Sequence, residues 1–421
     1  MRAPTATYCC VARGVGLSAN KHLKSGQRVF VGAATNEPSS LLANLKETGI
    51  PQDIRFIQFP IGGLNTQDFT AFENTATVET FFMTPALDKA HDPQRVHFKP
   101  MQMRWVYDYL QNDVDVALLQ VARDRDGDLR IGPNSDFVGA VLESADVVIA
   151  ELNHAIVAPA GAPRITESRI DFLFESEREI PEMAPPVIDE AAQVIGATVA
   201  DLIQDGDCLQ TGIGAIPAAI LAQLGNKNDL GMHGGLIDDG GMALIANGNL
   251  TGRQKPLDQG LHITGIGLGT KAMMDWLAET PQVVFRGANH THEASAIARL
   301  PNFVSINSAV EIDLYGQINA EMARGRQISG TGGSVDFMRA AKHSPNGKSI
   351  VAMNATAKGG EISRIVPKVE MVTALRTDVD YVVTEFGVAH LKHGSNQERA
   401  EALISIAAPQ FRDELRATLS S

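Results

Sequence analysis

The chain has 421 residues, more than the roughly 250–300 that one hydrophobic core organises, so we expect two or three domains. Hydrophobic residues make up 44% and charged residues 20% of the sequence, which excludes wholesale disorder and fibrous repeats. The net charge of −13 argues against nucleic acid or an anionic membrane as a partner.

Cysteine usage and the N-terminus bear on the compartment. The three cysteines, Cys9, Cys10 and Cys208, suggest neither a disulfide framework nor a CxxC metal motif. We therefore expect a reducing cytoplasm and no metal. Residues 1–13 contain no apolar stretch of signal-peptide length, and no run approaches the roughly 18 apolar residues of a membrane span. We expect a cytoplasmic protein that neither spans nor binds a membrane.

Short apolar runs alternate with segments of helical periodicity along the chain. Runs of this length bounded by Gly, Asp or Pro predict strands buried on both faces, and they occur at residues 28–32, 114–121, 147–150, 283–285 and 381–383. Apolar residues recur at helical spacing in residues 38–48, 188–204, 215–224 and 399–407. This alternation predicts an α/β fold with mainly parallel, open sheets.

A proline-rich stretch, residues 180–186, precedes an amphipathic helix and is typical of a linker. It separates an expected N-terminal domain, residues 1–183, from an expected C-terminal domain, residues 187–421. Each part opens with a helix, then has a Gly turn, a strand, a Gly-containing loop and a helix with a proline near its start, Pro38 or Pro217. We infer a diverged internal duplication.

Two glycine-rich loops are candidates for anion binding. The loop Gln210–Pro217 follows a strand and precedes a helix, where glycines allow backbone N–H groups to face an anion or a carbonyl oxygen. A plain tight turn explains it equally well. The loop Gly265–Lys271 resembles a phosphate loop, but Lys271 lacks the Ser or Thr that follows the lysine of a P-loop. A turn with a solvated lysine is the alternative there.

Two further motifs lie near the C-terminal third. Ser329–Phe337 has three glycines within four residues, which allows a bulky ligand to approach the backbone, although another turn is the alternative. In residues 307–319, alternation places Glu311 and Asp313 on one face of a strand. Such acids are costly in an apolar context unless paired or used, so they are either functional, exposed at an edge, or bound to an arginine.

These four motifs, in this order, resemble the acetyl-CoA hydrolase/transferase family, which includes the 4-hydroxybutyrate, butyrate:acetate and succinate:acetate CoA-transferases. Residues 29–32, 149–153, 362–367, 382–389 and 398–415 add to the resemblance. It implies two similar α/β domains with the site between them, and a homodimer or larger homo-oligomer. It also implies coenzyme A, as acyl-CoA substrate, with a small carboxylic acid or water as the second reactant.

The resemblance implies a glutamate nucleophile that forms an acyl anhydride and then a glutamyl-CoA thioester. In the matching stretch, residues 230–240, the position of that glutamate is Gly235, which has no side chain to form the thioester. Three interpretations follow: water enters the vacated space and the protein is a hydrolase, another carboxylate such as Asp238, Asp239 or Glu311 acts instead, or the protein binds CoA esters without covalent turnover. Acyl exchange onto a carrier thiol is a further alternative.

The remaining site residues are also implied by the resemblance. Gln210 matches a residue near the reacting carbonyl, and His233 is either a general base or a structural hydrogen-bonding group. Gly332 and Gly333 match a loop that lets the thioester approach the backbone, and Lys358 matches a basic position near the CoA phosphates. Independently of the resemblance, the segments 81–84 and 101–105 are candidates to shape an acyl pocket from the first domain, although an apolar lining alone names no substrate. The loop that contacts CoA is matched by Gly212, Ile213, Gly214, Ala215 and Ile216.

Overall fold

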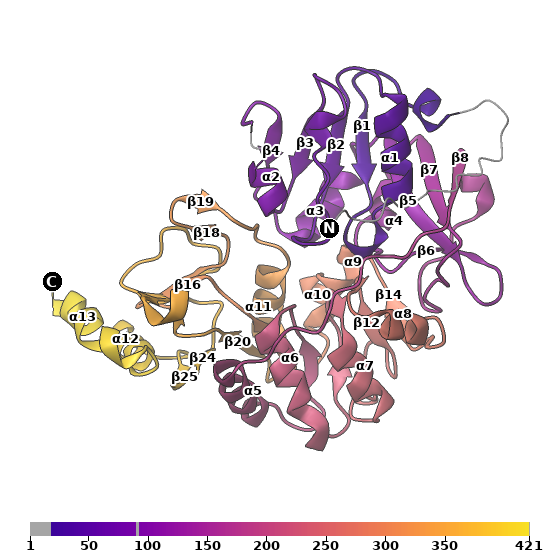
Figure 1. Ribbon diagram of the computed structural model, residues 1–421. Helices are drawn as coiled ribbons and strands as arrows, with labels where there is room; N and C mark the ends of the chain where they lie inside the picture. Colours follow the sequence, from indigo (N-terminus) through magenta and orange to yellow (C-terminus); the bar gives the residue numbers. More distant parts are fainter. Residues whose placement is uncertain (1–17, 90–91, 421) are drawn as a thin grey trace, which may run out of the picture. The chain divides into compact units, whose positions relative to one another are not determined.

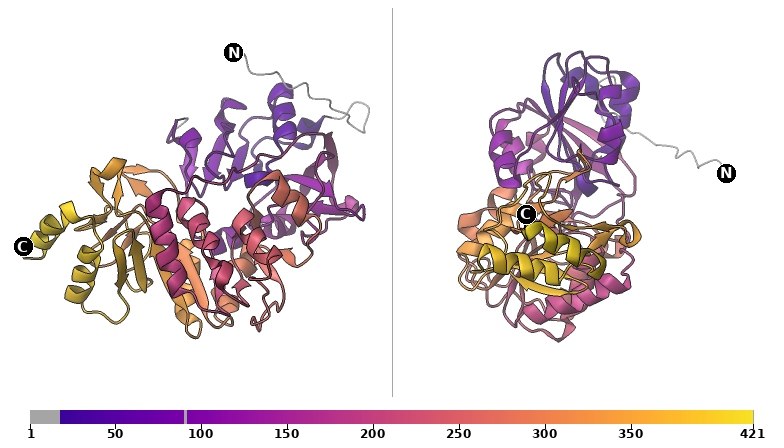
Figure 2. Two further views of the ribbon diagram at one scale, coloured as in Figure 1. Left: turned by 60° about the horizontal axis from the view of Figure 1, so that its bottom comes forward. Right: turned by 90° about the vertical axis from the view of Figure 1, so that its left-hand side faces the viewer.

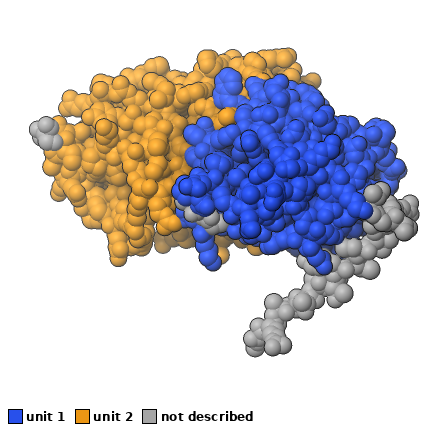
Figure 3. Space-filling model, turned by 90° about the horizontal axis from the view of Figure 1, so that it is seen from above, with its two compact units in different colours: residues 1–100, 105–183, 265–287 blue, residues 101–104, 184–264, 288–421 orange. Residues whose placement is uncertain are grey.

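The computed structural model describes residues 18–89 and 92–420 (Figure 1), so Cys9 and Cys10 lie outside the described residues. The third cysteine, Cys208, is a buried free thiol. The chain divides into two compact units, coloured separately in Figure 3. Unit 1 consists of residues 1–100, 105–183 and 265–287, and unit 2 consists of residues 101–104, 184–264 and 288–421.

The units change over at residues 183–184, but they are not consecutive stretches of the chain. The segment Gly265–Gly287, expected in the C-terminal domain, belongs to unit 1. Its backbone explains why, because Phe285 N donates to Gly161 O and Ser135 N donates to Gly265 O. Division of the chain into successive domains, and a site between them, stay predictions.

Unit 1 is built on an eight-stranded sheet. Its strands lie in the order β4-β3-β2-β1-β5-β7-β8, all paired in parallel, and β6 pairs antiparallel with β5. The strands are β1 (Arg28–Val31), β2 (Arg55–Gln58), β3 (Thr77–Thr80), β4 (Val96–Phe98), β5 (Val116–Arg123), β6 (Leu129–Ile131), β7 (Val147–Asn153) and β8 (Phe172–Ser176).

Helices and short strands complete unit 1. Leucines of α1 join Val29 and Val31 of β1 in one buried core cluster. The elements are η1 (Ala19–His22), η2 (Ala34–Asn36), α1 (Ser39–Thr48), η3 (Phe69–Ala71), α2 (Pro85–Lys89), α3 (Met103–Leu110), which starts in residues assigned to unit 2, α4 (Val138–Ser144), η4 (Glu167–Arg169), β13 (Ile266–Gly267), α8 (Lys271–Leu277) and β14 (Val283–Phe285).

Unit 2 contains a six-stranded sheet in the order β10-β9-β15-β20-β24-β25, in which only β25 is antiparallel. The strands are β9 (Cys208–Gln210), β10 (Gly231–Met232), β15 (Phe303–Asn307), β20 (Lys348–Ala352), β24 (Tyr381–Thr384) and β25 (Gly387–His390). Smaller strands are β11 (Leu236–Ile237), β12 (His262–Thr264), β16 (Glu311–Asp313), β17 (Ile318–Asn319), β18 (Met322–Ala323), β19 (Arg326–Gln327), β21 (Thr356–Ala357), β22 (Ile362–Ser363) and β23 (Ile365–Val366).

Helices of unit 2 pack on this sheet, and α5 and α6 lie side by side (Figure 2). Side chains of α11 and α12 share a buried cluster with Val382 of β24. The helices are α5 (Glu190–Leu202), α6 (Ala215–Ala222), η5 (Leu224–Asn226), α7 (Asp239–Ala246), α9 (Ala288–Thr291), α10 (Ala294–Ile297), α11 (Ser334–His343), η6 (Lys358–Gly360), α12 (Asn396–Ser405), η7 (Pro409–Phe411), α13 (Arg412–Ala417) and η8 (Thr418–Ser420).

The predicted α/β fold with open parallel sheets is confirmed. The five predicted strand runs and the four helices predicted from helical spacing are present, most of them with shifted ends. The helix expected from residue 399 begins at Asn396, because Ser395 and Glu398 form a capping box. The helix expected to open the N-terminal part is only the single 3-10 turn η1. No helix in the described parts of the chain has both the length and the hydrophobicity needed to cross a membrane.

Both sheets place their first strand in the interior, with later strands on either side. After β1 the chain builds β2 to β4 on one side and then crosses to β5 on the other, and after β9 it builds β10 before crossing to β15. This shared order is what an internal duplication predicts, although the duplication itself stays a prediction. Ligands of open parallel sheets bind at the carboxyl ends of the strands where the order reverses. In unit 2 this position lies between β9 and β15.

Candidate active site

An amide and hydroxyl cluster occupies the reversal point of the sheet in unit 2. The register pairs Gln210, the last residue of β9, with Ser305 of β15. Gln210 Oε1 accepts hydrogen bonds from Ser305 Oγ at 3.1 Å and Asn307 Nδ2 at 3.2 Å, and Asn307 Nδ2 also lies 2.8 Å from Ser305 Oγ. These contacts orient the amide, and its Nε2 donates to no other described residue. Gln210 therefore has a free donor for a carbonyl oxygen.

The predicted CoA-contacting loop follows β9 directly. Gly214 is the N-cap of α6 and has a φ of 117°, a conformation that favours glycine. The helix begins at Ala215, so Pro217 lies in its first turn, where the missing N–H costs no helical hydrogen bond. Gly212 has open space around its Cα, and Ile213 is 48% exposed. The loop therefore presents backbone and one apolar side chain to solvent.

The segment after β10 passes beside this cluster. His233 N donates to Leu209 O, and Gly234 packs on Gln210, because a Cβ at Gly234 would lie 3.2 Å from Gln210 Cγ. The His233 ring points to a different neighbour, with Nε2 3.3 Å from the backbone oxygen of His290. Burial, reinforced by the charge of Lys255, lowers the pKa of His233 to about 3. The structural alternative for His233 has direct support, and a general-base role stays a prediction.

A histidine that the sequence analysis did not single out fills the space beside Gly235. A Cβ built at Gly235 would lie 2.9 Å from His292 Cε1 and 3.1 Å from Nε2, and one built at Gly333 would lie 2.2 Å from Nε2. The imidazole is 2% exposed and lies 4.4 Å, centroid to centroid, from the ring of Phe337. Two glycines far apart in the sequence therefore meet around one imidazole ring.

The glycine loop before α11 is held by the segment 101–104. Met103 N donates to Gly332 O at 3.1 Å, and Thr331 Oγ1 donates to Met101 O at 2.9 Å. The structure thus brings part of the segment predicted to line an acyl pocket directly against the glycine loop predicted to admit a thioester.

An ion pair and a buried acid lie at the start of α11. Arg104 Nε bonds Glu293 Oε2 at 2.7 Å, and Arg104 N donates to Asp336 Oδ2 at 3.4 Å. Burial is the main cause that raises the pKa of Asp336 to about 7, although Arg104 and Arg339 oppose the shift. An acid that titrates near neutrality beside a glycine loop is a candidate for a functional group.

Two of the candidate replacement carboxylates, Asp238 and Glu311, have structural roles, as does Asp313, which lies on β16 with Glu311. The third candidate, Asp239, is the first residue of α7, and its role stays a prediction. Asp238 is the N-cap of α7 and accepts Gly241 N at 2.9 Å, and its burial raises the pKa of the carboxyl. Glu311 Oε1 accepts Asn319 Nδ2 at 3.0 Å, so its partner is an amide and not the arginine we considered. Asp313 is fully buried and accepts the backbone N–H groups of Tyr315 and Gln317.

Two predicted lysines lie outside this cluster. Lys358 is exposed in η6 between the paired strands β21 and β22, and its φ is 51°. Among the described residues, neither Lys358 nor the candidate carboxylate Glu311 forms a hydrogen bond or an ion pair with His292, the ring beside Gly235. Lys271 follows the loop 265–270 and pairs with Asp275 one turn along α8, which supports the solvated-turn alternative.

One set of side chains has ligand atoms close enough to share a cation. The ligand atoms of His233, Asp258 and His290 lie within 4.8 Å of one another. His290 Nε2 already lies 2.8 Å from Asp258 Oδ2. The buried Lys255 acts electrostatically on both His233 and Asp258, and its positive charge opposes a metal ion there. The expected absence of a metal stays a prediction.

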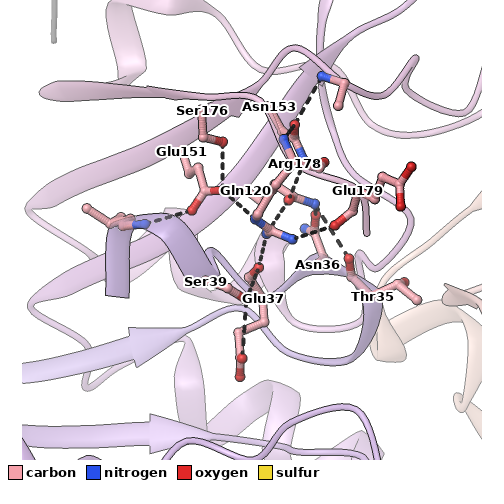
Figure 4. Close-up of polar contacts among 12 residues, drawn as sticks. Thr35, Asn36, Glu37, Ser39, Gln120, Glu151, Asn153, Ser176, Arg178 and Glu179 are labelled. Carbon is pink, nitrogen blue, oxygen red and sulfur yellow. Dashed lines mark hydrogen bonds and ion pairs between the residues drawn. The ribbon is translucent and has the colours of Figure 1, made fainter. Parts of the chain in front are cut away.

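Unit 1 carries its own buried polar network at the reversal point of its sheet (Figure 4). Glu151 Oε1 accepts Ser176 Oγ and Arg178 Nε, each at 2.8 Å, and Oε2 accepts Leu41 N in the first turn of α1. Arg178 also donates to the Glu37 carbonyl and to Gln120 Oε1. Because the carboxylate and the guanidinium are satisfied by one another and by neighbours, this network anchors α1 to the sheet.

The residues missed by sequence reasoning are His292 and Ser305. His292 lies in a polar stretch, residues 289–293, that has no motif and no periodicity. Ser305 lies inside an apolar strand, where its alternation with Asn307 was the only available signal. The packing of His292 against Gly235 and Gly333, and the contact of Ser305 with Gln210, are tertiary properties that neither stretch encodes locally.

Comparison with known proteins gives matches over both units. Residues 18–180 match the family described as acetyl-CoA hydrolase/transferase N-terminal domain, and residues 269–419 match its C-terminal domain. The chain is 42% identical over 306 residues to the 4-hydroxybutyrate coenzyme A transferase of Clostridium kluyveri, which covers 72% of this chain and 71% of that protein.

Two further similarities extend over almost the whole chain. The succinyl-CoA:acetate/propanoyl-CoA:succinate CoA transferase of Fasciola hepatica is 32% identical over 404 residues, covering 93% of this chain and 84% of that protein. The crystal structure of RipA from Yersinia pestis superimposes with a TM-score of 0.87 at 30% identity, covering 96% of this chain and 95% of that chain.

Proposed function

The chain belongs to the acetyl-CoA hydrolase/transferase family, and we propose that it acts on acyl-CoA thioesters, with hydrolysis as its main reaction. One observation carries this proposal. Gln210, at the reversal point of the sheet in unit 2, packs on Gly234, and the next residue, Gly235, meets Gly333 through the ring of His292; the family resemblance relates Gln210, Gly235 and Gly333 to the reacting thioester. The relatives named as transferases favour an enzyme over a protein that only binds CoA esters.

The preference for hydrolysis over CoA transfer rests on Gly235. A covalent transfer needs a carboxylate that can carry first the acyl group and then CoA, and glycine supplies none. Asp238 is occupied in capping a helix, and Glu311 is bonded to Asn319. Transfer through one of these carboxylates is the second candidate function, in which a small carboxylic acid replaces water.

Coenzyme A would be held by backbone and by one cation. We assign the loop Gly212–Ile216 and the glycines Gly332 and Gly333 to the pantetheine and thioester, since they offer backbone without bulky side chains. The exposed Lys358 suits a CoA phosphate as a point charge. Gln210 Nε2 would donate to the carbonyl oxygen as negative charge develops there.

Two wider expectations belong to the same proposal. Sparse cysteines, with Cys208 buried as a free thiol, support a reducing cytoplasm as the compartment. The family resemblance supports a homodimer or larger homo-oligomer. Light scattering of the purified protein measures the second of these directly.

The test is incubation of the purified protein with a series of acyl-CoA esters, with and without isotopically labelled acetate, followed by mass spectrometry. We expect release of free CoA without acetate, and an acid product whose amount equals the CoA released. CoA exchange that requires acetate would favour the transferase reaction. Saturable CoA binding without turnover of any ester would contradict both reactions.

A further inference from the structure

His292 is held in one position by its surroundings. It lies between α9 and α10, and its backbone N donates to Ala288 O at 3.1 Å. One face of its ring lies against Phe337, which belongs to the buried cluster that includes Phe303 and Ala340. The ring also lies against the backbones of Gly235 and Gly333. A ring packed this closely has few alternative rotamers.

The two glycines are what makes room for the imidazole. Cβ atoms at Gly235 and Gly333 would lie 2.9 Å and 2.2 Å from ring atoms of His292, well inside van der Waals contact. Neither distance is compatible with a side chain at these positions unless the ring moves. The imidazole therefore occupies the space into which a side chain at residue 235 would project.

The chemistry of this imidazole is set by burial and by one hydrogen bond. Burial lowers the pKa of His292 to about 3, so the ring is neutral at physiological pH and carries one lone pair, although this pKa makes it a weaker base than a histidine that titrates near the working pH. Nδ1 lies 2.8 Å from Thr291 Oγ1. Nε2 lies on the side of Gly235 and Gly333 and has no hydrogen-bond partner within the described residues. A general base at Nε2 requires the tautomer in which Nδ1–H donates to the Thr291 hydroxyl, because this tautomer leaves the lone pair on Nε2.

We propose that His292 is the general base of a thioester hydrolysis at this site, an inference that rests on the proposed function. Nε2 removes a proton from a water molecule while the water oxygen bonds to the thioester carbonyl carbon. The tetrahedral adduct collapses with breakage of the C–S bond, and the proton passes from Nε2 to the leaving thiolate. One acyl-CoA and one water give one carboxylic acid and one CoA thiol, and no acyl-enzyme forms.

The geometry favours this assignment over a carboxylate nucleophile. Gln210, whose Nε2 is a free donor, packs against Gly234. His292 packs against the next residue, Gly235. A donor for the carbonyl oxygen and an acceptor for the proton of water thus flank one dipeptide. General-base catalysis needs these two groups around the reacting carbon, and it needs no carboxylate at residue 235.

The test compares wild-type protein with His292→Gln and with a matched control, His262→Gln. His262 is also a buried histidine, and its burial lowers its pKa to about 4. We expect His292→Gln to lose on the order of 10²-fold or more in kcat for CoA release, with CoA affinity by calorimetry within about twofold of wild type. His262→Gln should keep its kcat. A folded His292→Gln variant that hydrolyses as fast as wild type would overturn the proposal.

A labelling experiment on wild-type protein covers the case of a variant that fails to fold. With enzyme in excess over acyl-CoA in H₂¹⁸O, direct attack of water places the label in the acid product and leaves the protein unlabelled. Label in a protein carboxylate would overturn the general-base assignment and leave the proposed function intact. If the wild-type protein turns over no ester at all, the proposed function itself fails.

Discussion

Substitution of Gly235 by alanine tests the packing on which the active-site argument depends. The added Cβ would lie 2.9 Å from His292 Cε1, 3.1 Å from Nε2 and 3.9 Å from Phe337 Cζ. Overpacking of this kind typically costs about 1–3 kcal/mol of unfolding free energy. Removing a glycine also stabilises a protein by about 0.4–1 kcal/mol through the unfolded chain. The packing cost must therefore be measured against another glycine.

Gly225→Ala is a suitable control, because a Cβ there meets nothing within 4 Å and the residue is exposed. We expect Gly235→Ala to be less stable than Gly225→Ala by about 1–3 kcal/mol. Urea unfolding followed by circular dichroism gives the difference from the midpoints at a common slope. In a double-mutant cycle, His292→Ala should remove most of the penalty, because the ring is the atom group that clashes. Equal stability of the two glycine variants would refute the close approach of His292 to Gly235.

Three other predictions concern different parts of the chain. Glu151→Ala leaves the buried Arg178 without its carboxylate and should cost about 3–5 kcal/mol in urea unfolding, whereas an effect under about 1 kcal/mol would contradict the anchoring network. In the native state Asp336 has a pKa of about 7 and keeps its proton up to that pH, whereas in the unfolded state it loses the proton near pH 4. The free energy of unfolding therefore falls as the pH rises from about 4 to 7. The unfolding free energy of Asp336→Asn should rise relative to that of wild type by up to about 1.4 kcal/mol per pH unit over that range. A difference in unfolding free energy that does not change with pH would exclude the raised pKa. Lys358→Gln should weaken CoA binding about two- to fivefold, and less at high salt, while the exposed Lys392→Gln leaves it unchanged in calorimetry.

The fold was predictable because its signals are local. Short β-branched runs bounded by turn residues correspond to β1, β5, β7 and β24, which are buried on both faces. Glycine and proline marked the turn between β9 and α6. The assignment of Gly265–Gly287 to unit 1 was not predictable, because it depends on backbone hydrogen bonds to Gly161 and Ser135, over 100 residues earlier in the chain.

Some residues of the candidate site were predictable from local sequence signals, and others were not. Gln210, Gly235 and Gly333 were found because glycines between strands and helices, and a resemblance along the chain, are visible in sequence order. The partner of those glycines was not found, since a histidine in a polar stretch is far more often solvated than catalytic. What distinguishes His292 is its burial against Phe337, and burial arises only when α9, α11 and the segment after β10 are packed together.

This packing bears on the expectation that Gly235 stands where the family resemblance implies a glutamate. On the sequence alone, a single substitution at residue 235 is expected to place a carboxylate there. In the structure the space belongs to the His292 ring, and a glutamate at residue 235 would begin with a Cβ 2.9 Å from it. A carboxylate can therefore be placed there only if the His292 ring moves or residue 292 becomes smaller at the same time. In the proposed mechanism the glycine and the histidine act together, because residue 235 supplies no carboxylate and its lack of a side chain leaves room for the neutral imidazole.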